Sequence, residues 1–161
     1  MKTIVAISDT HGNVKAVEGL YGLFSECDYI VHLGDGYRDM KTLYQEFGSK
    51  IYQVDGNCDV TVSPLKYFIL EVEDVKILLT HGDMFGVKIS LTRLADFALK
   101  NDCRVALYGH THQADVQTVN GVTLVNSGSL SYFTAQKSIA YIVVNGSKVV
   151  VKINETAVKN Y

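Results

Sequence analysis

Apolar runs that stop abruptly at polar loops constrain the fold of this chain more than any other feature. Residues 2–7 are β-branched and apolar, and they end at the polar run of residues 8–13. Residues 29–33 repeat this arrangement and end at Gly34-Asp35-Gly36. Later apolar runs end in the same way at residues 55–59, 81–83 and 109–112. Strands that lead directly into polar loops are typical of α/β sheets, which bind ligands at the carboxyl ends of their strands.

Helical spacing of apolar residues predicts three helices. The first starts after Asn13, a plausible N-cap, and its apolar face consists of Val14, Val17, Leu20, Tyr21 and Phe24. The second is closed by Gly48, and its apolar face consists of Met40, Leu43, Tyr44 and Phe47. The third is predicted from the spacing of Leu91, Leu94, Ala95 and Ala98. Helices therefore separate several of the predicted strands.

The C-terminal third of the sequence is nearly all strand. Besides the first two strands, the pattern predicts strands over residues 51–54, 65–72, 75–80, 105–108, 116–119, 122–125, 139–144 and 149–153. Asn145-Gly146 is a hairpin turn signal between the last two. We expect one α/β domain over residues 1–161, an αββα sandwich of two stacked mixed β-sheets flanked by helices, with the second sheet largely antiparallel.

The composition argues against several kinds of binding partner. The 15 Lys and Arg residues nearly balance the 17 Asp and Glu residues, which leaves a net charge of −2 and no basic surface for duplex nucleic acid or an anionic membrane. The longest apolar run, residues 139–144, is far too short to span a bilayer, and the first residues lack a signal-peptide pattern. The three cysteines form no Cys-x-x-Cys pair and no disulfide framework. We expect a soluble protein of the reducing cytoplasm.

Metal-binding residue types gather in the polar loops. Four of the five histidines fall there, and the seven donors are Asp9, His11, Asp35, Asn57, His81, His110 and His112. Oxygen and imidazole donors without a thiolate suit Mn, Fe, Zn, Co or Ni. Seven donors exceed the needs of one tetrahedral ion, and sharing one carboxylate would give each of two ions four protein ligands. The sequence therefore predicts a site for two metal ions.

Local spacing supports convergence within two of these loops. If the backbone is extended, residues i and i+2 point to the same side, so Asp9 with His11, and His110 with His112, would each present two donors to one place. The alternative is ordinary loop polarity, with aspartates capping helices and histidines bonded to the backbone. Any one fragment is a weak signal, but five in order favour metal binding.

Other polar residues in these loops have more than one interpretation. His32 lies inside a predicted strand and is expected to be a hydrogen-bonded histidine of the core, or one that supports the metal ligands, rather than a ligand itself. Asp55, Asp59 and Asp83 either cap turns or orient the metal ligands. Cys58 is either an inert thiol or a group that contacts substrate, and we take it as a candidate substrate-binding residue.

Six short motifs together resemble a known family. They read SDTHGN, GDG, GNCD, THGD, GHTH and NSGS. In this order they are similar to the calcineurin-like metallophosphoesterase superfamily, and within it to small bacterial and archaeal phosphodiesterases without a cap domain, over residues 2 to about 130. The resemblance implies an αββα sandwich. It also implies two metal positions, one held by Asp9, His11 and His112 and the other by Asn57, His81 and His110, with Asp35 bridging them.

Two departures from larger relatives narrow the expected activity. Protein phosphatases of this superfamily have a histidine directly after the metal-binding asparagine and an arginine soon after the Gly-Asp turn, whereas this chain has Asn57-Cys58 and Gly34-Asp35-Gly36-Tyr37-Arg38. These differences argue against protein phosphatase activity. The usual Asn-Pro-Gly-Ser loop is replaced by Asn126-Ser127-Gly128-Ser129.

These observations lead to a hypothesis about function. We expect a metal-dependent phosphodiesterase that hydrolyses a small phosphodiester or nucleotide, with two divalent transition-metal ions as cofactors, manganese first among them and Ni, Co, Zn or Fe as alternatives. Ions about 3.5 to 4 Å apart would lower the pKa of a bridging water, so that hydroxide is the nucleophile. The catalytic residues would be Asp35, Asn57 and His81. With no histidine after Asn57 to act as an acid, we expect substrates with good leaving groups.

Two alternatives remain open at this point. One is a phosphomonoesterase or dinucleoside-polyphosphate hydrolase with the same site. The other is a protein-interaction scaffold, like the retromer subunit that shares this fold after losing site residues. All seven donors are present here, which favours catalysis. The sequence leaves a homo-oligomer possible.

Overall fold

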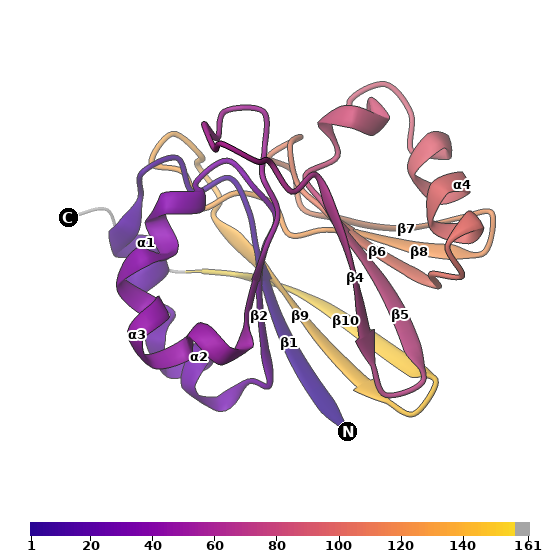
Figure 1. The fold of residues 1–161 in the computed structure, drawn as a ribbon, viewed down its shortest axis with the longest axis horizontal. Helices are drawn as coiled ribbons and strands as arrows, with labels where there is room; N and C mark the ends of the chain where they lie inside the picture. The colour runs from indigo at the N-terminus through magenta and orange to yellow at the C-terminus, as the bar shows by residue number, and fades with distance from the viewer. Residues whose placement is uncertain (157–161) are drawn as a thin grey trace.

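A computed structural model describes residues 1–156 as two β-sheets stacked face to face, with helices on the outer faces (Figure 1). The first sheet has the strand order β10-β9-β1-β2-β3. Its strands are β1 (Lys2–Ile7), β2 (Tyr29–His32), β3 (Ile51–Gln53), β9 (Ser138–Asn145) and β10 (Lys148–Glu155). β1 pairs in parallel with β2 and antiparallel with β9. The sheet is therefore mixed, with its N-terminal strand at the centre.

The second sheet is also mixed and has the order β4-β5-β6-β8-β7. Its strands are β4 (Tyr67–Val72), β5 (Val75–Thr80), β6 (Val105–Tyr108), β7 (Asp115–Val119) and β8 (Val122–Asn126). β5, β6 and β8 are parallel to one another, and the hairpin partners β4 and β7 form the two edges. The predicted sandwich of two mixed sheets is confirmed.

One part of the predicted topology is wrong. We expected the second sheet to be largely antiparallel, but the hairpin β9–β10 joins the first sheet beside β1. Alternation decides which face of a strand is buried, not which sheet it enters. In β9, Ala140 and Ile142 face the core between the sheets, and Ile139 faces the helices. Such a strand fits either sheet. The strand with which it pairs is decided by tertiary packing, which cannot be read from sequence periodicity.

Short helices cover both outer faces (Figure 1). They are α1 (Val14–Glu18), α2 (Tyr21–Glu26), the 3₁₀ segment η1 (Tyr37–Leu43), α3 (Tyr44–Phe47), the 3₁₀ segments η2 (Gly48–Lys50) and η3 (Asp83–Phe85), and α4 (Thr92–Lys100). α1 to α3 pack on the first sheet and α4 packs on the second. Within residues 1–156, no helix combines the length and apolarity needed to cross a membrane.

The first predicted helix is interrupted and the second begins as a 3₁₀ helix. Asn13 caps α1 as expected, because its Oδ1 accepts a hydrogen bond from the Ala16 N–H at 3.2 Å. The helix is followed by Gly19, a residue with poor helix propensity, and α2 starts two residues later. In η1, Asp39 accepts a hydrogen bond from the Gly12 N–H at 2.8 Å, which ties the first turn to the loop after β1.

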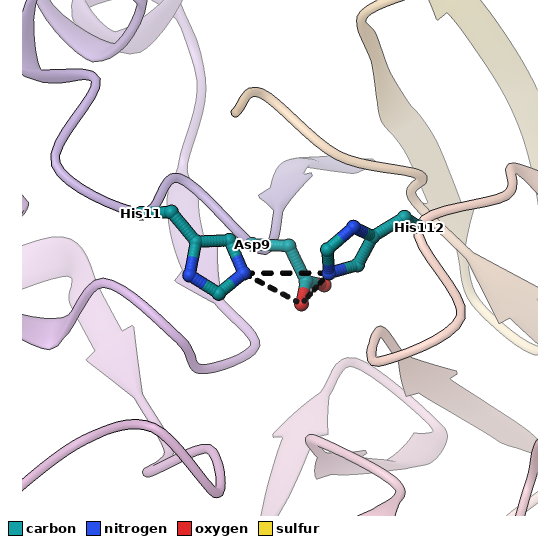
Figure 2. A group of neighbouring side chains, drawn as sticks. All are labelled: Asp9, His11 and His112. Atoms are coloured by element: carbon teal, nitrogen blue, oxygen red, sulfur yellow. Dashed lines mark hydrogen bonds and ion pairs between the residues drawn. The ribbon is translucent and has the colours of Figure 1, made fainter. Parts of the chain in front are cut away.

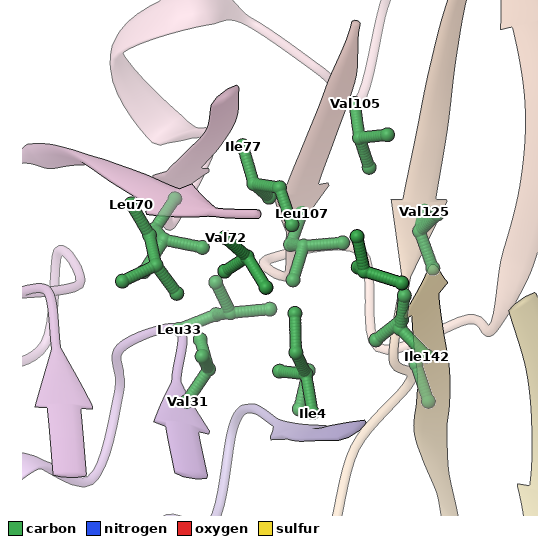
Figure 3. Packing of buried hydrophobic residues seen from close by; sticks show 14 of the residues in the cluster. Ile4, Val31, Leu33, Leu70, Val72, Ile77, Val105, Leu107, Val125 and Ile142 are labelled. Atoms are coloured by element: carbon green, nitrogen blue, oxygen red, sulfur yellow. The ribbon is translucent and has the colours of Figure 1, made fainter. Parts of the chain in front are cut away.

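The main core lies between the two sheets (Figure 3). Ile4 and Val31 of the first sheet face Ile77 and Leu107 of the second, and all four are almost completely buried. Burying a side chain of this size stabilises the fold by roughly 1.5 to 3 kcal/mol. Because this packing fixes one sheet on the other, it also fixes the relative positions of the loops at their carboxyl ends.

Candidate metal centre

The first group of donors comes from both sheets (Figure 2). Asp9 and His11 lie in the loop after β1, and His112 lies in the loop after β6. The Nε2 atom of His112 is 3.0 Å from Asp9 Oδ1 and 3.3 Å from His11 Nε2. These atoms converge on one place from segments about one hundred residues apart in the chain, as their sequence separation of 101 shows.

The second group lies beside the first. His81 Nε2 is 3.1 Å from His110 Nδ1, 3.1 Å from Asn57 Oδ1 and 3.4 Å from Asp35 Oδ2. His81 is buried, whereas Asn57 is exposed at the mouth of the site. The four residues come from the loops after β2, β3, β5 and β6, the positions predicted from the sequence.

Asp35 lies between the two groups. Its Oδ2 atom is 3.7 Å from His11 Nε2 in the first group and 3.4 Å from His81 Nε2 in the second. The carboxylate is 3% exposed, so it contacts both groups with little access for water. This single side chain therefore joins the two sets of donors.

The environment of the buried Asp9 carboxylate indicates whether these residues suit a cation. Asp9 is completely buried, and its Oδ2 accepts hydrogen bonds from the Ser8 hydroxyl and from the His110 N–H. Its Oδ1 accepts no well-oriented hydrogen bond within residues 1–156 and lies 3.0 and 3.8 Å from the Nε2 atoms of His112 and His11. Leaving a buried charged acceptor unsatisfied costs free energy. A divalent cation among these three residues would satisfy it, so the donor set fits a metal.

Hydrogen bonding prepares His81 as a ligand. Its Nδ1 lies 2.8 Å from the Leu33 carbonyl oxygen, so Nδ1–H is the donor and Nε2 faces Asp35, Asn57 and His110. Burial is the largest single effect and would lower the pKa of His81, but the Asp35 and Asp9 carboxylates and the Leu33 carbonyl together raise it. Burial also acts against ionised Asp35, yet His81 and the Cys58 N–H hold the Asp35 pKa below its usual range. A bound cation would compete with the His81 proton.

The backbone conformation of the donors differs from the prediction. Five of the seven have positive φ angles: Asp9 at 52°, His11 at 43°, Asp35 at 58°, His110 at 68° and His112 at 61°. The expectation of extended backbone is therefore wrong, and so is the expectation that His110 and His112 meet at one place. His110 faces His81 and His112 faces His11. Each left-handed residue costs of order 1 kcal/mol, which the surrounding contacts must offset.

One carboxylate organises the turn that carries Asp35. Asp59 Oδ2 accepts hydrogen bonds from the N–H groups of Asp35 and Gly56 at 2.8 and 2.9 Å, and Oδ1 accepts from Gly36 and Tyr37 at 3.0 and 2.9 Å. Burial opposes ionisation, but these backbone hydrogen bonds lower the Asp59 pKa. Of the two interpretations offered for Asp59, the structure supports both, since it caps a turn and orients a donor.

Asp55 and Asp83 act on the surrounding loops. Asp55 accepts a hydrogen bond from the Leu65 N–H at 2.6 Å, and Asp83 lies 3.7 Å from the ammonium of Lys66. The Lys66 ammonium also donates to the Gly56 carbonyl at 3.0 Å. Neither carboxylate belongs to the groups of donors described above.

A buried network that the sequence did not reveal supports the first loop. His32 Nδ1 accepts a hydrogen bond from the Gly34 N–H at 3.2 Å, so its Nε2–H donates to Thr10 Oγ1 at 3.1 Å, and the Thr10 hydroxyl donates to Asp39. His32 is fully buried, and burial lowers its pKa to about 4. The core role expected for His32 is confirmed. In the sequence, Thr10 could be recognised only as a loop residue, and nothing marked Asp39 for this role.

The loop of residues 126–129 connects the two ligand-bearing loops. Asn126 Nδ2 donates to the Gly109 carbonyl and to Thr111 Oγ1, both at 2.9 Å. Ser129 Oγ donates to the Asp9 carbonyl at 2.9 Å. Asn126 and Ser129 are completely buried. The loop therefore positions donors from both sheets.

Two glycines allow these loops to approach one another. A Cβ atom on Gly56 would overlap the Asp35 carboxylate, and a Cβ on Gly109 would overlap the Ser8 hydroxyl and lie 2.6 Å from Asp9 Oδ2. Neither neighbour can move without displacing a donor residue. Glycine is therefore required at both positions.

Cys58 lies next to the donors but differs from them in character. The thiol is exposed, and its sulfur is among the atoms near His11 and Asp35. Burial and the Asp35 carboxylate raise its pKa, so the neutral thiol is favoured. Cys58 also lines a cavity of about 250 Å³ that reaches His11 and Asp35. A larger cavity of about 830 Å³ lies between residues 87–92 and β7, and it includes Thr111 but none of the seven donors.

The chain is similar to known phosphoesterases in sequence. The family model of the calcineurin-like phosphoesterase superfamily domain matches residues 1–148. A probable metallophosphoesterase of Methanocaldococcus jannaschii is 33% identical over 130 residues, 78% of this chain and 67% of that protein. A phosphodiesterase of the same organism is 23% identical over 156 residues, 84% of this chain and 89% of that protein.

Solved structures share the fold. A predicted phosphoesterase from Streptococcus pneumoniae superposes with a TM-score of 0.82 at 25% identity, covering 96% of this chain and 89% of that one. Vps29 from Entamoeba histolytica, in complex with zinc, superposes with a TM-score of 0.73 at 18% identity, covering 96% and 98%. Metallophosphoesterases use divalent metals, and the His and Asp groups found here suit that use. The chain belongs to the calcineurin-like phosphoesterase superfamily and is a metallophosphoesterase.

Proposed function

We propose that the protein is a phosphodiesterase that hydrolyses a small phosphodiester or nucleotide with two divalent metal ions. The observation that carries this proposal is the position of Asp35, whose Oδ2 lies 3.7 Å from His11 and 3.4 Å from His81. A carboxylate shared between two sets of imidazole and oxygen donors suits a pair of ions. The named phosphodiesterase among the relatives supports the choice of a diester substrate.

The residues divide into two ligand sets and one shared side chain. Asp9, His11 and His112 would hold one ion, and Asn57, His81 and His110 the other, with Asp35 between them. When bound, such ions activate water as a nucleophile and offset the charge of the phosphoryl oxygens. The partial exposure of the His11 and His112 side chains, 27% and 43%, leaves the site open to substrate on one side.

The surroundings of Asn57 favour substrates with good leaving groups. The residue after Asn57 is Cys58, whose pKa is raised, so its proton is held too tightly for an efficient acid at neutral pH. Lys66 is occupied by the Gly56 carbonyl and by Asp83. The leaving oxygen would therefore depart with little help from the protein, which suits diesters of acidic alcohols or phenols.

The test combines metal content with turnover. Metal-free protein is reconstituted with Mn, Ni, Co, Zn or Mg in turn, and hydrolysis is measured with monoesters, cyclic diesters and linear diesters. We expect close to two ions per chain, best activity with manganese, and faster turnover of diesters than of monoesters. Elemental analysis that shows one ion at saturation would contradict the two-ion proposal. Faster turnover of monoesters would support a phosphomonoesterase instead.

A matched substitution tests the bridging role. Asp35→Asn keeps the shape of the side chain but removes the charge shared by both groups, so we expect weaker binding at both positions and at least about a hundredfold lower activity. Asp96→Asn removes an exposed carboxylate remote from the site and is the control for net charge. Metal binding without turnover of any ester would favour a scaffold role, as the shared fold of Vps29 allows. A cytoplasmic location and possible homo-oligomerisation remain predictions.

A further inference from the structure

Two tyrosines and two cationic residues form an exposed strip beside the metal centre. Tyr37, Arg38, Lys41 and Tyr44 lie along η1 and the start of α3, and together they line a cavity of about 490 Å³. Tyr37 is 39% exposed and Tyr44 is 41% exposed. The two exposed aromatic rings flank the two cations on one surface, and we call these four residues the tyrosine strip.

The tyrosine strip is continuous with the proposed catalytic centre. Tyr37 and Arg38 also line the cavity of about 250 Å³ whose walls include His11, Asp35 and Cys58. Tyr37 follows Asp35 by two residues, and its N–H donates to the same Asp59 carboxylate that holds the Asp35 N–H. The strip is therefore held in a fixed relation to the bridging carboxylate.

The cations of the strip are not neutralised by the protein. Arg38 and Lys41 form no ion pair with any residue in the range 1–156. Tyr44, in contrast, is fixed, because its phenol oxygen accepts a hydrogen bond from Gln53 Nε2 at 2.8 Å. The strip thus offers free positive charge and π faces, the combination with which proteins bind bases attached to a phosphate backbone.

We propose that the tyrosine strip binds the nucleoside arm of the substrate, with the base stacked on Tyr37 and Arg38 attracting the phosphodiester charge. This inference rests on the proposed phosphodiesterase activity and narrows it to nucleotide-bearing diesters. The cavity of about 250 Å³ lies below the usual volume for a whole ligand, so it accommodates one arm while the phosphoryl group occupies the centre. The leaving group lies outside this cavity.

Two diesters with the same leaving group test the inference. The 4-nitrophenyl ester of thymidine 5′-phosphate carries a base, and methyl 4-nitrophenyl phosphate does not. We expect kcat/KM to be at least roughly tenfold higher for the thymidine ester, since stacking of one base on an aromatic ring has about that effect. Tyr37→Leu should reduce this ratio by roughly tenfold, mainly through KM, and Tyr37→Phe should preserve it. Arg38→Gln should lower kcat/KM for both esters, because both are anions.

A matched control and a binding measurement complete the design. Tyr21→Leu removes a tyrosine of similar exposure, 46%, on α2, and should leave the ratio unchanged. A ratio near one in the unsubstituted protein, or a ratio indifferent to Tyr37→Leu, would overturn the inference while the phosphodiesterase proposal stands. Calorimetric titration with AMP and with ribose 5-phosphate measures binding at the tyrosine strip without the need for turnover. If neither ester is hydrolysed, but AMP binds about tenfold more tightly than ribose 5-phosphate and Tyr37→Leu abolishes that preference, the inference stands and the activity proposal fails. Equal binding of AMP and ribose 5-phosphate overturns the inference.

Discussion

Replacement of Asp59 by asparagine tests whether one carboxylate holds the turn that carries Asp35. The carboxylate accepts four backbone hydrogen bonds, two on each oxygen. Asparagine has the same shape but only one accepting oxygen, so two of the four N–H groups would face an amide NH₂ instead. Whichever way the amide is oriented, one of the two pairs, Asp35 with Gly56 or Gly36 with Tyr37, loses its acceptor.

The magnitude follows from the number and environment of these hydrogen bonds. A hydrogen bond to a charged group contributes about 1.5 to 3 kcal/mol, and two are lost. Asp59 is only partly buried, so water can reach some of the released N–H groups. We therefore expect Asp59→Asn to lower the free energy of unfolding of the metal-free protein by about 2 to 4 kcal/mol. Misplacing the residues that orient a metal ligand should also weaken metal affinity by about 10- to 100-fold.

Urea unfolding in the presence of a chelator and calorimetric titration with manganese measure the two effects separately. Asp96→Asn, which removes a surface carboxylate with the same change of charge, should alter the free energy of unfolding by less than about 0.5 kcal/mol. If Asp59→Asn matched this control in both stability and manganese affinity, the four hydrogen bonds would not be holding the turn. If stability fell but affinity did not, Asp59 would support the fold alone.

Three further predictions concern other parts of the centre. The folded-state pKa of His32 is lowered to about 4 from an ordinary 6.5, so the unfolded chain binds more protons between these values and stability falls as pH drops through this window. His32→Gln should remove about 3 kcal/mol of that pH dependence, read as the difference between urea unfolding at pH 7 and pH 4, and an unchanged slope would exclude His32 as its source. Gly109→Ala should destabilise the protein by several kcal/mol and abolish manganese-induced thermal stabilisation, because its Cβ would displace Asp9; a normal melting curve would show that the loops can separate freely. Cys58→Ser should change turnover of nitrophenyl diesters by less than about tenfold while His81→Ala abolishes it, and equal loss in both would make the thiol part of the catalytic machinery.

The sequence was sufficient for the layers of the fold and for the location of the donors. Strands such as β1 and β5 end at polar loops, and the carboxyl ends of parallel strands meet at one edge, so residues as distant as Asp9 and His110 could be placed together. The sheet that takes β9 could not be predicted, since its alternating pattern suits either sheet. Pairing between strands far apart in sequence is decided by packing.

The local geometry of the donors could not be predicted from residue spacing. Spacing suggested extended backbone, whereas His110 and His112 adopt left-handed conformations and face different groups. Glycine is the usual signal for positive φ, and these residues are histidines, so their conformation depends on contacts from elsewhere. Asn126 supplies such contacts, through the Gly109 carbonyl and the Thr111 hydroxyl on either side of His110. These contacts require the completed fold.

The central position of β1 determines when the molecule can be completed. β1 lies between β2 and β9, and β10 completes the same sheet, so the first sheet remains unfinished until residues 138–155 have been synthesised. Asp9, near the N-terminus, must also meet His112 from the opposite sheet. A metal ion would therefore bind only after the two sheets have formed and packed together, and it would stabilise the completed fold. Manganese should then slow unfolding and leave the folding rate unchanged, as stopped-flow traces with and without chelator can show, because the contacts it adds form after the folding transition state.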